Sequence, residues 1–77
     1  MPVNGEVYEA RREAVYATIR DHPGQHLPSI VEQVKTHPAF TGKTTGRYTD
    51  IAQYLMELYM ADRVHYRDGW HITEAHE

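Results

Sequence analysis

The C-terminal stretch RVHYRDGWHIT, residues 63–73, constrains the fold of this chain more than any other segment. Two short runs of strand-forming residues flank Arg-Asp-Gly, and a three-residue loop with Gly69 in the left-handed conformation would join them as antiparallel strands. The pairs that this loop sets are Tyr66 with Trp70, His65 with His71 and Val64 with Ile72. All the large apolar side chains then share one face, whereas a two-residue Asp-Gly turn would divide them between two faces. Burial therefore favours the three-residue loop, and we predict a β-hairpin over about residues 63–74.

Two helices are expected in the first half of the chain. The first is predicted over about residues 5–22, where apolar residues recur at helical spacing until the His-Pro-Gly sequence at residues 22–24 stops the helix. The second is predicted over about residues 28–36. Pro28 suits a first helical position, and Pro38 disfavours helical geometry in the residue before it.

The third helix has the clearest periodicity and is predicted over about residues 45–62. Its apolar positions at three- and four-residue spacing are Tyr48, Ile51, Leu55, Leu58 and Tyr59. Three helices followed by a hairpin make a mainly α fold. At this length the whole chain, residues 1–77, is expected to form one domain around one small core.

Composition limits the classes of function. The chain has no cysteine, which excludes disulfides and thiolate metal sites. No apolar run is long enough for a membrane span or a signal peptide, so we expect a cytoplasmic protein without a membrane partner. Lysine and arginine total 8 against 11 acidic residues, a net charge of −3, which counts against strong binding driven by phosphate charge alone.

The Gly-Lys-Thr sequence at residues 42–44 resembles the end of a nucleotide-binding P-loop, but its spacing excludes one. A P-loop has a glycine five residues before the Gly-Lys pair, and that position is His37. The chain is also too short for the parallel sheet that presents such a loop. With no nucleophile–histidine–carboxylate arrangement and no glycine-rich cofactor loop, we expect neither an enzyme nor a cofactor.

Six histidines raise the question of a metal site. In the predicted hairpin His65 and His71 are cross-strand neighbours on the outer face, while Pro-Gly separates His22 from His26 and keeps them off a common helix face. Two imidazoles without a third ligand make a weak site, so no metal is expected. His65 and His71 are expected to face solvent, and their joint protonation below about pH 6.5 is expected to weaken the hairpin by like-charge repulsion.

The order of elements, and above all the segment IAQYLMELYMADRVHYRDGWHIT, resembles the winged helix-turn-helix domain. Leu55 and Leu58 occupy the leucine positions of that family's third helix, and the hairpin corresponds to its wing. The segment HPGQHLPSIVEQV is similar to the family's link from the first helix through a stub strand into the second. The resemblance covers about residues 5–74. Asp62 stands where the family often has glycine, and aspartate tolerates the left-handed conformation better than most residues.

The resemblance implies a DNA-binding protein whose third helix docks in the major groove and whose wing touches phosphate. The exposed face of the third helix is expected to include two carboxylates, Asp50 and Glu57, beside the residues that would contact DNA. The candidate DNA-binding residues are Lys43, Thr44, Thr45, Arg47, Thr49, Gln53, Tyr54 and Arg67. Arg47 and Gln53 are chemically suited to guanine and adenine respectively. The loop residues Lys43, Thr44 and Thr45 could donate hydrogen bonds to phosphate, and Arg67 at the tip of the wing would make a further contact. The function so implied is a transcriptional regulator or a recombination accessory factor that binds double-stranded DNA.

The alternative is a protein–protein interaction module, an inhibitor or assembly subunit, on the same fold. The net charge of −3 and the carboxylates on the supposed recognition face favour this alternative. The aromatic residues expected in the core or at its edge are Tyr8, Tyr48, Tyr66 and Trp70. The residues expected on outer faces, as a partner surface, are Tyr16, Tyr54 and Met60. A homodimer through the first or the third helix is compatible with either function.

Overall fold

Three helices precede a two-stranded antiparallel hairpin, as expected from the sequence. The structure is a computed structural model, and it describes residues 4–40 and 48–73. Its elements are α1 (Asn4–Asp21), α2 (Leu27–Val34), the 3₁₀ turn η1 (Pro38–Phe40), α3 (Tyr48–Met60), β1 (Val64–Tyr66) and β2 (Trp70–Ile72). The fold is therefore mainly α, with a topology consistent with that of a winged helix. The predicted start of the third helix at residue 45 lies outside the described residues.

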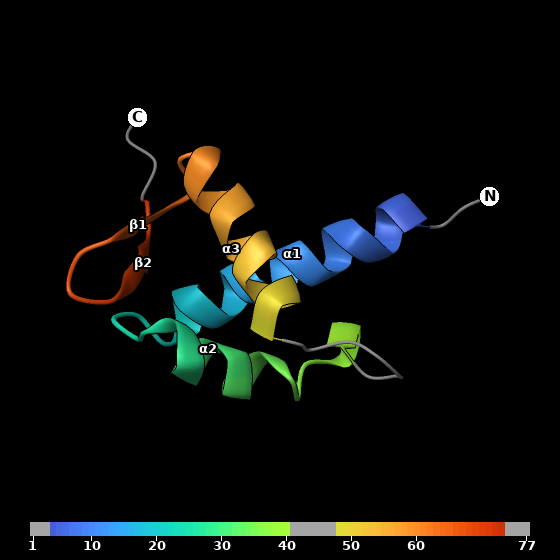
Figure 1. Ribbon diagram of the computed structural model, residues 1–77, viewed down its shortest axis with the longest axis horizontal. Helices are drawn as coiled ribbons and strands as arrows, with labels where there is room; N and C mark the ends of the chain where they lie inside the picture. The colour runs from blue at the N-terminus through green and yellow to red at the C-terminus, as the bar shows by residue number, and fades with distance from the viewer. Residues whose placement is uncertain (1–3, 41–47, 74–77) are drawn as a thin grey trace.

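In Figure 1 α3 lies across α1, α2 lies below both, and the hairpin lies at the end of the molecule away from the first turn of α1. All three helices, η1 and β1 contribute to one core. Its fully buried members are Val15 and Ile19 from α1, Ile30 and Val34 from α2, Ile51 and Leu58 from α3, and Val64 from β1. Because α1 packs against α2, α3, η1 and β2, it is the central support of the fold. No helix in the described ranges has the length and apolarity needed to cross a bilayer.

The hairpin has the predicted register. Its Cα partners are Val64 with Ile72, His65 with His71 and Tyr66 with Trp70. In the three-residue loop Asp68 and Gly69 have φ of 54° and 117°, and the Arg67 N–H donates to the Gly69 carbonyl at 2.8 Å. Of the four apolar side chains, Val64 is buried and two others are half-buried, whereas Tyr66 is 52% exposed. The prediction that Tyr66 lies in the core or at its edge is therefore wrong.

The link between α1 and α2 is hydrogen-bonded to the hairpin at a single hairpin residue, Trp70. Gln25 forms an antiparallel bridge with Trp70. The Gly24 N–H donates to the Trp70 carbonyl at 2.8 Å, and the Trp70 N–H donates to the Gln25 carbonyl at 2.9 Å. This short pairing corresponds to the expected stub strand, and it fixes the hairpin to the helices.

The reversal from α3 to β1 is a Schellman motif with aspartate at the position that usually holds glycine. Asp62 has φ of 62°, its N–H donates to the Tyr59 carbonyl at 3.0 Å, and the Arg63 N–H donates to the Leu58 carbonyl at 2.9 Å. The chain therefore turns directly from the third helix into the first hairpin strand.

Candidate nucleic-acid interface

Half of the predicted DNA-binding residues fall in the described part of the chain. Lys43, Thr44, Thr45 and Arg47 lie outside the described residues. Thr49, Gln53 and Tyr54 lie in the first two turns of α3, and Arg67 lies at the tip of the hairpin.

Thr49 and Gln53 are both exposed, as expected for residues on the outer face of α3. Four positions apart, they lie one turn from each other on the same side of the helix. Gln53 also lines a small surface pocket with Tyr8, Asp50 and Tyr54, so it lies near the border between α3 and α1. Asp50, which was expected on the exposed face, is half-buried in this pocket, so a carboxylate lies beside Gln53 in the first half of α3.

The prediction that Tyr54 lies on the outer face of α3 is wrong. Its side chain is only 7% exposed. Tyr54 makes edge-to-face contacts with Tyr8 of α1, at 5.0 Å between ring centroids, and with Phe40 of η1, at 6.0 Å. Three aromatic rings from three elements fill this corner of the core, so Tyr54 supports α3 from beneath.

Arg67 is exposed at the hairpin tip, as expected. Within the described ranges no carboxylate forms an ion pair with its guanidinium. Its carbonyl accepts a hydrogen bond from His71 Nε2 at 3.2 Å, which fixes the backbone of the loop rather than the side chain. The positive charge is therefore presented at the far end of the wing.

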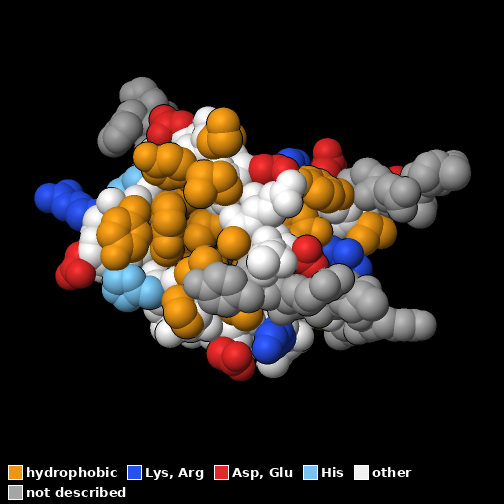
Figure 2. Space-filling view, in the orientation of Figure 1, with side chains coloured by type: hydrophobic (Ala, Val, Ile, Leu, Met, Phe, Trp, Pro, Cys, Tyr) orange, Lys and Arg blue, Asp and Glu red, His pale blue; other side chains and the backbone are white. Residues whose placement is uncertain are grey.

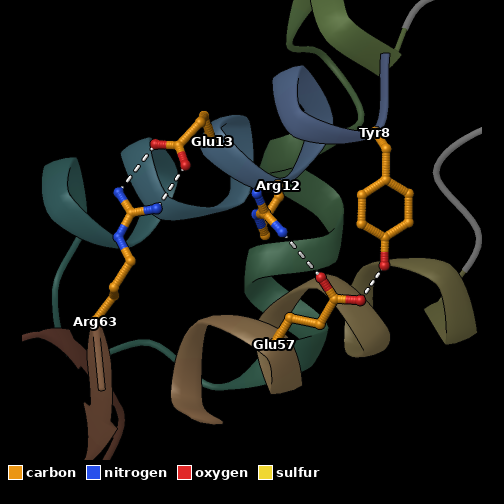
Figure 3. A network of polar contacts seen from close by, with 5 residues as sticks. All are labelled: Tyr8, Arg12, Glu13, Glu57 and Arg63. Carbon is orange, nitrogen blue, oxygen red and sulfur yellow. Dashed lines mark hydrogen bonds and ion pairs between the residues drawn. The ribbon is translucent and has the colours of Figure 1, made fainter. Parts of the chain in front are cut away.

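Glu57, expected on the exposed recognition face, is bound instead by two residues of α1 (Figure 3). The Tyr8 hydroxyl donates to Glu57 Oε2, and Arg12 Nη1 lies 3.1 Å from Glu57 Oε1. The hydrogen bond from Tyr8, with help from Arg12, lowers the pKa of Glu57, and the same bond raises the pKa of Tyr8. Because Arg12 compensates this carboxylate, Glu57 repels a phosphate backbone less than the sequence indicated.

A second ion pair joins α1 to the start of the hairpin. Arg63 donates from both terminal nitrogens to Glu13, at 2.5 and 3.0 Å (Figure 3). Its guanidinium lies 4.2 Å from the centroid of the Tyr16 ring. These hydrogen bonds lower the pKa of Glu13 and raise that of Arg63. Arg63 therefore holds the fold together and is not a free cation for phosphate. Tyr16, expected on an outer face, is half-buried beneath it.

The sequence did not predict an apolar face that runs from α3 onto the hairpin. The name apolar face is used below for the group of five residues Met56, Tyr59, Met60, Tyr66 and Trp70. Four of its members are large exposed residues: Met56 at 50%, Tyr59 at 50%, Met60 at 78% and Tyr66 at 52%. Trp70 connects the two tyrosines through edge-to-face contacts with Tyr59, at 5.9 Å, and Tyr66, at 5.2 Å. Figure 2 shows hydrophobic side chains gathered over α3 and the hairpin.

One signal for this face was present in the sequence. Met56 and Met60 are four residues apart on the side of the helix opposite Ile51 and Leu58. Met60 was expected to lie outside, as it does, whereas Tyr59 was expected in the core stripe and is half exposed.

The two wing histidines stack on the outer face of the hairpin, as their predicted register requires. Their ring centroids are 5.6 Å apart with 21° between planes. His65 Nδ1 lies 3.4 Å from Thr73 Oγ1. Over residues 4–40 and 48–73, no group of three histidine, aspartate or glutamate side chains is placed to hold a metal ion.

Comparisons with protein-family models, curated proteins and solved structures found no match. The function is therefore inferred from the topology, the exposed side chains and their charges.

Proposed function

We propose that this protein binds double-stranded DNA as a small transcriptional regulator or recombination accessory factor. In this arrangement the first half of α3 enters the major groove and the hairpin tip contacts phosphate. The observation that carries the proposal is the order of elements: α3 is followed after a tight reversal by a hairpin whose tip presents Arg67 to solvent. A winged helix uses these two elements for DNA docking.

The exposed side chains give this docking its chemistry. Thr49 and Gln53 are exposed on α3 and can read base edges. Lys43 and Arg47, which precede them in the sequence, and Arg67 on the wing supply positive charge for phosphate and guanine. Tyr54 takes no part, because its ring is buried.

The ion pairs limit how strongly DNA is held by charge alone. Arg12, Arg20, Lys35 and Arg63 all pair with carboxylates. If Lys43, Arg47 and Arg67 each neutralise one phosphate, log K should fall with log salt at a slope of about −2.7. Binding to random DNA is then weak, and base contacts from α3 supply most of the useful affinity.

Fluorescence anisotropy of a labelled random-sequence duplex at about 50 and 200 mM salt tests this proposal. We expect Arg67→Gln to weaken binding and to reduce the salt slope by about 1. Arg20→Gln makes the same change in net charge on α1, where Arg20 already pairs with Asp21 at 3.1 Å, and should leave the slope unchanged. No binding at about 100 µM protein and about 50 mM salt, or equal effects of the two substitutions, would overturn DNA as the partner.

A protein–protein interaction module is the second candidate, and the apolar face favours it. The second half of the outer face of α3 offers Met56 and Met60 where a groove-binding helix would profit from polar or basic groups. Passage through a heparin column at low salt without retention would support this function. Elution that depends on salt would support DNA binding.

A further inference from the structure

The outer face of α3 changes character halfway along the helix. Thr49 and Gln53 are exposed polar residues in its first half, whereas Met56 and Met60 are exposed apolar residues in its second half. The apolar half continues through the contact of Tyr59 with Trp70 onto the hairpin. The apolar face thus lies beside the proposed DNA-contacting residues without including them.

The charges of the apolar face indicate what can cover it. None of its five members carries a charge. At its two ends, charges of both signs occur: Asp62 after α3, next to Arg63, which is paired with Glu13, and Arg67 beside Asp68 in the hairpin loop. Such an edge offers no field to attract a strongly acidic or basic partner. In a two-fold contact each patch meets a copy of itself, so a neutral centre brings no like charges together.

The area of the face indicates how tightly a second copy would be held. A tyrosine buries roughly 150–250 Å² when fully covered, so four large side chains at half exposure or more offer about 400–500 Å² on each copy. Stable interfaces bury about 800 Å² on each partner. Two copies of the apolar face therefore suit a weak, reversible dimer, with tyrosines as anchors and methionines that adapt to the opposing surface.

We propose that two copies of this chain associate symmetrically through the apolar face. The interface lies on the second half of α3 and on the hairpin, and it leaves Thr49 and Gln53 outside. Self-association does not depend on DNA, so the dimer and the DNA-binding proposal stand or fail separately.

Sedimentation equilibrium of the full chain without DNA, from about 1 µM to about 1 mM, tests the dimer. We expect the average mass to rise towards that of two chains, with a Kd in the micromolar to millimolar range. Met60→Lys keeps a good helix former but places a charge on the most exposed residue of the face, and it should weaken association at least tenfold.

Val7→Lys is the matched control, because Val7 is also an exposed apolar residue of a helix, at 41%, but lies on α1 outside the apolar face. It should associate like the wild type. Circular dichroism of each variant checks that the helices persist. A wild type that stays monomeric over the whole range, or a Met60→Lys variant that associates as strongly as the wild type, would overturn the proposal.

Discussion

Gly69 and Gly24 lie in contact where the hairpin loop meets the link between α1 and α2. A Cβ atom on Gly69 would lie 2.3 Å from the Gly24 carbonyl oxygen, and Gly69 has φ of 117°. A Cβ on Gly24, at φ of 85°, would meet only His71 Cε1 at 3.7 Å. We expect Gly69→Ala to lower the free energy of unfolding by about 2–4 kcal/mol, because steric overlap adds to backbone strain. Gly24→Ala should cost only the strain, about 1–2 kcal/mol. Urea denaturation measures both, and equal losses would contradict the close contact.

Tyr54 is buried in the core, and its replacement is also expected to destabilise the fold. We expect Tyr54→Ala to lower the free energy of unfolding by about 3–5 kcal/mol, since it leaves a cavity between Tyr8 and Phe40. Tyr59→Ala removes a half-exposed ring and should cost about 1 kcal/mol. Thermal unfolding followed by circular dichroism compares the two. A Tyr54→Ala protein as stable as the wild type would contradict the burial of the Tyr54 ring.

The exposure of these two tyrosines shows what helical spacing leaves undecided. Ile51, Leu55 and Leu58 define the centre of the buried stripe of α3, and they were predicted correctly. Tyr54 and Tyr59 lie on opposite flanks of that stripe, and the sequence of the helix does not distinguish the two flanks. Aromatic residues of α1 and η1, distant in the chain, cover the Tyr54 flank.

At the scale of elements, the C-terminal turn of α3 contains an aspartate, Asp62, at a position where glycine would stabilise the fold more. Asp62 adopts φ of 62° in the Schellman motif and adds a negative charge at a helix C-terminus. We expect Asp62→Gly to raise the free energy of unfolding by about 0.5–1 kcal/mol, because glycine takes this conformation without a Cβ penalty. Asp21→Gly, at the end of α1, should lower it by a similar amount. Chemical denaturation measures both, and a destabilised Asp62→Gly protein would show that the aspartate side chain supports the turn.

The hairpin was the element most completely determined by the sequence. Side chains alternate with period 2, so a shift of one residue would have moved Val64 out of the core, and the observed pairing of Val64 with Ile72 follows. The bridge from Gln25 to Trp70 was harder to predict, because a single paired residue is too short to show the alternation of apolar and polar side chains that marks a strand. Of the candidate site, the exposure of Thr49, Gln53 and Arg67 was predictable from their polarity and position.

At the scale of the whole molecule, α1 is bound by charge to elements distant in the chain. Glu57 of α3 contacts Tyr8 and Arg12, and Arg63 at the start of the hairpin contacts Glu13 (Figure 3). The partners are 45 to 50 residues apart, so no local spacing could have matched them. The expectation that Glu57 disfavours DNA binding rested on the side chain alone, and the compensating Arg12 became visible only in the folded chain.

These ion pairs make stability depend on pH in the acid range. The pKa values of Glu13 and Glu57 are lowered in the folded protein from an ordinary value of 4.5. The unfolded chain therefore binds protons more readily, and the contribution of both groups is complete above about pH 4.5 and falls as the pH drops through the lowered pKa values.

We expect the free energy of unfolding to decline from pH 5 towards pH 3, and a Glu13→Gln, Glu57→Gln double variant to show a shallower decline. The effect of the exposed Glu13 pair is limited to about 1 kcal/mol by solvent screening. Glu9→Gln, on an exposed position of α1, is the control and should follow the wild type. Urea unfolding at a series of pH values measures the slopes. A double variant with the wild-type slope would mean that other carboxylates govern acid unfolding, and that these two pairs do not couple α1 to the rest of the fold.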